Sequence, residues 1–465
     1  MSDRAGGIDR CRSRAARWLA AMALVTFPLL ALAPASAGAA TDDGASVKIV
    51  ASEPVSDFPR GMTFPVVATS DEEITGVDLL YRAAYIETLN EVGLPIEPAT
   101  TIDTSYELDL RDGSIPPGIE ILYRWRVTEA DGDMVETEDA PVTWLDTRFT
   151  WDEASSPRVQ VASYGRGADF NQQVLASAET TIDRLSERFS AEMTHPIRIW
   201  VYNSREDFTG SLAPNSEPWI VGAAYPWLGL INAVLPPSNP DELGRVIPHE
   251  ISHQVLFQAT QNPFNQPPSW LEEGLATLAQ TGGTASLWRA VEAAAGADQL
   301  DELRVLNGQF PYDSGEAMLA YGESMSVVTY LLDTYGEEGL SRLIAVLENG
   351  ITYDAAVQQA LGISLDQLSD DWHEAAQAQA QQELKDLGAT GIGGFTDLGG
   401  WGADLLASGS LIMAVVAVLA VVAVVRSRRR ARQEWTDSDD GLQETGYPGG
   451  SPAVRLPTNG NGAHL

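Results

Sequence analysis

The chain contains His249-Glu250-Ile251-Ser252-His253 and, after a short spacer, Trp270-Leu271-Glu272-Glu273-Gly274. On an α-helix, residues four apart lie on one face, so His249 and His253 can present their imidazoles to a single metal ion. Glu250 then lies beside them, within reach of a metal-bound water. The pattern therefore indicates the side chains needed for metal-assisted hydrolysis.

The residues around the pentapeptide predict a helix. Asn239 and Pro240 are typical of an N-cap and a first helical position, and Glu242 completes a pattern that is close to a capping box. Apolar residues follow at helical spacing: Val246, Ile247, Ile251, Val255 and Leu256. Pro248 removes the backbone hydrogen bond to Gly244, so we expect a kink there but no break.

The second motif supplies the expected third ligand. Ser269 and Glu272 have capping-box spacing, which gives Glu272 a structural role at the start of a second helix and leaves Glu273 on a different face. A catalytic zinc ion takes three protein ligands and keeps one open position. We therefore expect one Zn²⁺ per chain, bound by the two motif histidines and Glu273, with Glu250 as the general base.

The two motifs together resemble those of the gluzincin metallopeptidases, the thermolysin and aminopeptidase N type, and most closely the bacterial peptidase MA-like domains. The resemblance extends over about residues 150–380, and its specific part is confined to the motifs. It implies a peptide or protein substrate, zinc binding by His249, His253 and Glu273, and a general base at Glu250. Residues 221–225 lack the Gly-x-Met-Glu-Asn run of aminopeptidases, which leaves endopeptidase activity or another specificity.

Gluzincins usually add a Tyr or His that hydrogen-bonds the developing oxyanion. The candidate by position is Tyr321, on a predicted helix downstream of Glu273. The apolar residues around it slightly favour the alternative, a core tyrosine. Tyr225 and Tyr312 are weaker candidates for the same role.

Both ends of the chain indicate a membrane-anchored protein. Residues 1–40 combine arginines, an apolar stretch and small residues, as a secretory signal peptide does. Residues 404–425 predict a transmembrane helix, because residues 405–425 are apolar or small and long enough to span a bilayer, and the arginines that follow mark the cytoplasmic side. We expect a Gly-rich linker at residues 388–403 and a disordered cytoplasmic tail at residues 426–465. The bulk of the protein would then lie outside the cytoplasm, on a single-pass anchor in the cell membrane.

Two folded parts are expected between these ends. Residues 41–148 show the period-two alternation of short strands, which predicts an immunoglobulin- or fibronectin-like sandwich, although another all-β module fits as well. We favour a role as a spacer over a role in substrate binding. Residues 149–387 begin with strands and one long helix and continue almost wholly helical, which predicts an α+β metallopeptidase domain. The strand at residues 229–234 is either an edge strand for an extended peptide or an interior one.

Composition narrows the possible partners. The net charge is −36 and the chain has two lysines, so binding to nucleic acids or to anionic lipid headgroups is disfavoured. Cys11 is the single cysteine and lies in the predicted signal peptide, so no disulfide is expected.

The alternative function is a surface binding or adhesion protein whose zinc site is structural or catalytically idle. Glu250 argues against it, because a structural site needs ligands but no base. The sequence gives no oligomeric state.

Overall fold

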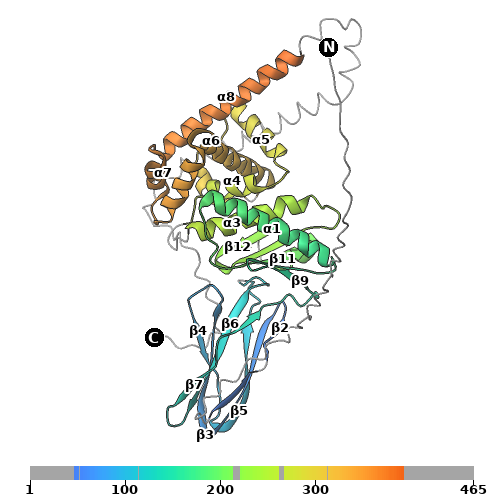
Figure 1. Cartoon of the computed structure of the whole chain (residues 1–465), viewed down its shortest axis with the longest axis vertical. Coiled ribbons are helices and arrows are strands. Elements are labelled where there is room, and N and C mark those ends of the chain that lie inside the picture. Colours follow the sequence, from blue (N-terminus) through green and yellow to red (C-terminus); the bar gives the residue numbers. More distant parts are fainter. Residues whose placement is uncertain are drawn as a thin grey trace, which may run out of the picture.

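The computed structural model of the chain describes residues 47–391, apart from residues 52, 114, 213–219, 261–265 and 312. These residues form a β unit, a second sheet and a group of helices (Figure 1). The predicted signal peptide, membrane-spanning segment and cytoplasmic tail lie outside the described residues. Among the helices that are described, none has the length and apolar character needed to cross a membrane.

The β unit contains antiparallel pairs only, as expected for an all-β part. Its strands are β1 (Lys48–Ala51), β2 (Val55–Asp57), β3 (Gly61–Ala83), β4 (Asn90–Gly93), β5 (Ala99–Asp109), β6 (Glu120–Glu129), β7 (Met134–Glu136) and β8 (Ala140–Thr143). The long strand β3 pairs with β5 through its first half and with β6 through its second. Phe64 and Tyr81, one from each half of β3, have ring centroids 6.4 Å apart, so the two halves pack face to face. The immunoglobulin or fibronectin type stays a prediction.

The second sheet has the strand order β12-β13-β11-β10-β9. Its strands are β9 (Asp152–Ser155), β10 (Val159–Ser163), β11 (Ile197–Tyr202), β12 (Gly222–Tyr225) and β13 (Leu230–Val234). The three central strands are parallel, and both outer strands are antiparallel to their neighbours. Every residue of β13 is buried, which is typical of a strand covered on both faces. The segment at residues 229–234 is therefore interior, and β12 is the edge strand beside it.

The helices are α1 (Ala168–Phe189), α2 (Arg205–Thr209), α3 (Glu242–Thr260), α4 (Ser269–Ala279), α5 (Ala285–Gly296), α6 (Ser314–Leu347), α7 (Tyr353–Leu361) and α8 (Leu365–Gly391). Short 3₁₀ turns lie at Pro226–Leu228 and Val305–Asn307. Helices α1 and α3 pack against one face of the second sheet, in a core that includes Ile199, Ile231 and Ile251. The largely helical second half is as predicted, although α8 continues into the first residues of the expected linker.

The β unit covers the other face of the second sheet (Figure 1). Trp200 of β11 is 3% exposed and lies in the same apolar core as Trp125 of β6. Arg198 of β11 forms an ion pair with Glu120, and Asn232 Nδ2 donates a hydrogen bond of 3.1 Å to the carbonyl of Pro117. The β unit therefore completes the core on the face of the second sheet opposite α1 and α3, in addition to any role as a spacer.

Candidate metal centre

Helix α3 carries the first motif and is not broken by Pro248. Proline has no N–H to donate to the carbonyl of Gly244. That carbonyl instead accepts hydrogen bonds from the N–H and the hydroxyl of Thr281, both 3.0 Å long. A Cβ at Gly244 would lie 2.3 Å from Thr281 Oγ1, so glycine is needed for this approach. The helix begins at Glu242. Residues 240 and 241, expected to be helical, form a turn instead.

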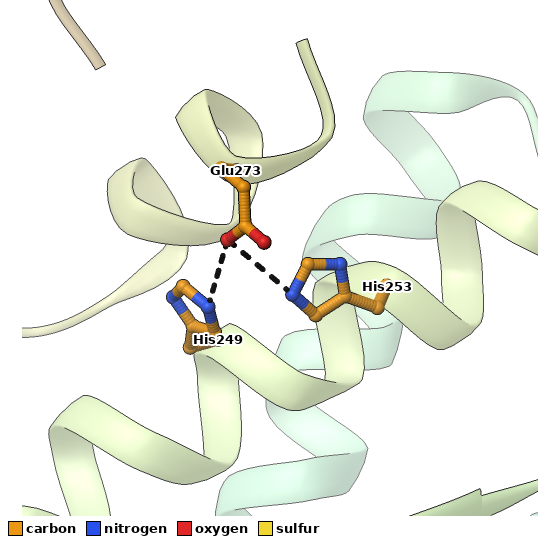
Figure 2. Close-up of side chains that lie close together, drawn as sticks. All are labelled: His249, His253 and Glu273. Carbon is orange, nitrogen blue, oxygen red and sulfur yellow. Dashed lines mark ion pairs between the residues drawn. The ribbon is translucent and has the colours of Figure 1, made fainter. Parts of the chain in front are cut away.

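The three expected ligands come together between α3 and α4 (Figure 2). Glu273 Oε2 lies 3.3 Å from His249 Nε2 and 3.7 Å from His253 Nε2. Ligand atoms about 2.0–2.1 Å from a tetrahedral zinc ion are themselves about 3.4 Å apart. The spacing of the three atoms therefore fits a single zinc ion.

The environment of Glu273 also fits a cation. Its Oε2 atom is buried and forms no hydrogen bond with the described residues. A buried carboxylate oxygen without a donor is costly, and a metal ion between the carboxylate and the two rings removes that cost. Burial raises the pKa of the Glu273 carboxyl, but His253 and His249 outweigh it, so the pKa lies below its usual value. The carboxylate is therefore ionised at neutral pH, as a ligand must be.

The second nitrogen of each histidine contacts a side chain of α4 or of the residue after it. Glu272 Oε1 lies 3.1 Å from His253 Nδ1, and Gln280 Nε2 lies 2.9 Å from His249 Nδ1. The predicted capping role of Glu272 is wrong, because α4 starts after Pro268 without a side-chain cap, and Glu272 turns toward His253 instead. Such contacts orient a ligating ring and fix its tautomer. Metal binding at His249 Nε2 requires the Gln280 amide to turn its oxygen toward Nδ1–H.

Sequence reasoning missed Gln280. It directly precedes Thr281, whose two hydrogen bonds to Gly244 attach this segment to α3. The only local signal for this contact was the proline four residues after Gly244, which leaves a carbonyl to be satisfied by another segment.

Glu250 is buried beside the ligands, with 6% of its surface exposed. Burial is the largest effect and raises the pKa of its carboxyl. His249, His253 and Arg245 lower this pKa and the Glu273 carboxylate raises it, and the net result is a raised pKa. The edge strand β12 passes directly over this carboxylate. A Cβ on Gly222 would lie 2.1 Å from Glu250 Oε1, so a larger residue at this position would displace the proposed base.

Tyr321 of α6 lies at the site and not in the core. It lines a cavity of about 370 Å³ together with His249 and Glu250, and a neighbouring one of about 300 Å³ that reaches His253 and Glu273. Its ring centroid is 6.0 Å from that of His249. Gly274 allows this approach of α6 to α4, because a Cβ there would lie 2.4 Å from a backbone oxygen of α6.

Of the two weaker tyrosine candidates, Tyr225 does not line these cavities. Tyr225 lies on β12, where burial and the nearby Glu250 carboxylate raise the pKa of its hydroxyl to about 12. Tyr312 lies outside the described residues.

Residues 177–378, which include both motifs and most of the helices, match the Peptidase MA superfamily. This match supports the peptidase MA-like domain that the two motifs indicated. A comparison with curated proteins finds no match.

The chain is similar at low levels to a number of solved structures, among them the following three. The M1 zinc metallopeptidase from Deinococcus radiodurans has 14% identity and a TM-score of 0.33, over 68% of this chain and 90% of its own. A mutant of that enzyme has 13% identity and a TM-score of 0.33, over 71% and 90%. A polysaccharide deacetylase from Bacillus cereus has 10% identity and a TM-score of 0.16, over 43% and 66%. Similarity at this level adds nothing about activity or substrate.

Proposed function

We propose that this chain is a zinc-dependent peptidase that hydrolyses a peptide bond in the cavity beside His249, His253 and Glu273. The observation that carries the proposal is the position of Glu250. Its carboxylate is buried next to the three candidate ligands and lines the same cavity, but it is not one of those ligands. A structural zinc site uses four protein ligands and has no need of an adjacent base, whereas a hydrolytic site uses three and a base.

Zinc is the metal that two imidazoles and one carboxylate fit best in a catalytic site. When bound, it polarises a carbonyl oxygen and lowers the pKa of water to about 7.

The residues of the chain supply the remaining steps. Glu250 takes the proton of the attacking water and gives it to the leaving amine, and its raised pKa favours the first of these transfers, because a carboxylate of higher pKa is a stronger base. Tyr321 donates a hydrogen bond to the oxygen that becomes negatively charged in the transition state. The outer edge of β12, which pairs with no strand in the described part of the chain, pairs with an extended substrate backbone, as strand addition to a sheet edge does in other peptide-binding proteins.

The proposed location is the outer side of a membrane, with a single C-terminal anchor. Its support is the apolar segment at residues 405–425, the arginines after it and the leader-like residues 1–40. The proposed substrate is accordingly an extracytoplasmic peptide or protein.

The test compares the full chain in detergent with Glu250→Gln, using metal analysis and an unbiased peptide library. Glu250→Gln should keep about one zinc per chain and the wild-type melting temperature, and should lose at least about a hundredfold in turnover. Glu374→Gln, at an exposed position on α8, is the matched control and should retain activity. Wild-type protein that holds zinc yet cleaves nothing, like Glu250→Gln, would favour the binding protein with an idle zinc site.

A further inference from the structure

The cavity of about 370 Å³ beside the ligands contains one strongly basic side chain. Apart from His249, the charged residues that line it within the described part of the chain are Glu250 and Arg245. Its other walls are apolar or carry hydroxyl and amide groups. An arginine in this position is notable in a chain with a net charge of −36.

Arg245 lies one helical turn before His249 on the same face of α3. Its Nε donates a hydrogen bond of 2.9 Å to Glu242 Oε2, and Nη2 contacts the same oxygen. Nη1 forms no hydrogen bond with any described residue, and the side chain keeps 34% of its surface exposed. Glu242 therefore orients the guanidinium while leaving donors free for a second anion.

Thr277 of α4 provides a second donor in the same cavity. It is 1% exposed, and its hydroxyl has no hydrogen-bond partner among the residues that the structure describes. It lies one turn after Glu273. Helices α3 and α4 are antiparallel here, since His253 contacts the start of α4 and His249 contacts the residue after its end. Arg245 and Thr277 consequently lie on the same side of the ligand cluster.

We propose that this cavity binds a carboxylate of the substrate, with Arg245 as the residue that determines this specificity and Thr277 as a second donor. The proposal rests on the peptidase function and names the substrate class of that site. One helical turn is about 5.4 Å and one residue of an extended peptide about 3.3 Å, so the carboxylate lies within about two residues of the scissile bond. Val246, Leu287 and Met318 line the same cavity, so they would contact the aliphatic part of the substrate residue that carries the carboxylate.

Two kinds of peptide present such a carboxylate: one with an acidic side chain beside the scissile bond, and one that ends there in a free C-terminus. The test uses two matched substrate pairs, Glu against Gln at that position and a free C-terminal carboxylate against its amide. The ratio of kcat/KM within each pair is measured for the full-length zinc-loaded protein. The pair that shows the preference identifies the source of the carboxylate.

We expect the wild type to prefer the charged member of one pair by about tenfold to a hundredfold, which is the usual effect of a hydrogen bond to a charged group. Arg245→Gln should bring that ratio close to one, and Arg245→Lys should give an intermediate value because a lysine lacks the planar fork. Arg60→Gln is the matched control. Arg60 also pairs with an acid three residues away, at 3.1 Å from Asp57, but lies in the β unit, so its ratio should equal that of the wild type.

The proposal is overturned if neither substrate pair shows a preference. It is also overturned if Arg245→Gln has the zinc content of the wild type and still prefers the charged peptide as strongly as the wild type does. If Arg245→Gln does not fold, Thr277→Val takes its place and should also reduce the ratio.

Binding of the same peptides to zinc-loaded Glu250→Gln, measured by calorimetry, separates this proposal from the peptidase function. Tighter binding of the charged peptide without any wild-type cleavage would support the carboxylate site and reject the peptidase. Equal binding of both peptides would reject the carboxylate site.

Discussion

Glu272 and Glu273, consecutive on α4, contact the two different nitrogens of one imidazole, that of His253. Glu272 Oε1 lies 3.1 Å from Nδ1, and Glu273 Oε2 lies 3.7 Å from Nε2. Consecutive residues on a helix point about 100° apart, so both can reach one ring only if that ring lies between them. The second motif therefore supplies one candidate ligand and the group that orients another.

Removing the orienting carboxylate should weaken metal binding less than removing a ligand. We expect Glu272→Ala to lower zinc affinity by about tenfold to a hundredfold, the usual effect of such a contact, and Glu273→Ala to lower it much further. Competition with a fluorescent zinc chelator measures both. Glu374→Ala, on the exposed face of α8, should bind zinc as the wild type does. Equal affinities for Glu272→Ala and wild type would show that the contact has no role in the site.

The position of Gly222 predicts a defect in activity that spares the metal. Gly222→Ala places a methyl group where Glu250 Oε1 now lies, since the distance from the added Cβ would be 2.1 Å. Turnover should fall by about tenfold or more because the base is displaced, while zinc content stays at the wild-type level. Gly308→Ala is the control, because its Cβ would meet nothing within 4 Å. A loss of zinc in Gly222→Ala equal to its loss of activity would contradict this division.

Much of the site could be predicted because it depends on local geometry. Two histidines four residues apart share a helix face whatever the rest of the fold does, and Glu250 is fixed beside them. The role of Glu272 was not predictable from its neighbours, because its spacing from Ser269 also suits a capping box. Only the packing of α4 on α3 decides that Glu272 contacts His253 instead of capping its own helix. Tyr321 comes from a separate helix, so its place in the cavity wall depends on how α6 packs.

The sheet shows the same limit. The alternation of residues predicts strands, and β13 was found close to its predicted bounds. Which strand forms the edge depends on pairing between segments, and β12 takes that place by pairing with β13. The packing of the β unit beneath Trp200 likewise has no local signature, since a tryptophan in a predicted strand can face either side of the sheet.

The hydrogen bonds of Thr281 predict a change in stability. Thr281→Val removes the hydroxyl that donates to the carbonyl of Gly244 and keeps the shape and the backbone N–H. The free energy of unfolding should decrease by about 0.5–1.5 kcal/mol, as for other hydrogen bonds to the backbone. Thr281→Ser keeps the hydroxyl and serves as the control. Urea denaturation followed by circular dichroism measures the difference, and a Thr281→Val protein as stable as Thr281→Ser would show that the backbone N–H alone satisfies this carbonyl.

Tyr321 separates a catalytic role from a packing role most directly. Its ring lines both cavities beside His249, and Phe310 packs on it edge to face with the centroids 5.0 Å apart, which holds the ring in place. Tyr321→Phe keeps that packing and removes the hydroxyl, so kcat should fall by about tenfold to a thousandfold while KM and melting temperature change little. Tyr330→Phe, at a half-buried position further along α6, removes a hydroxyl away from the cavities and should retain wild-type kcat. A Tyr321→Phe enzyme with unchanged kcat and a lower melting temperature would show that Tyr321 has a structural role only.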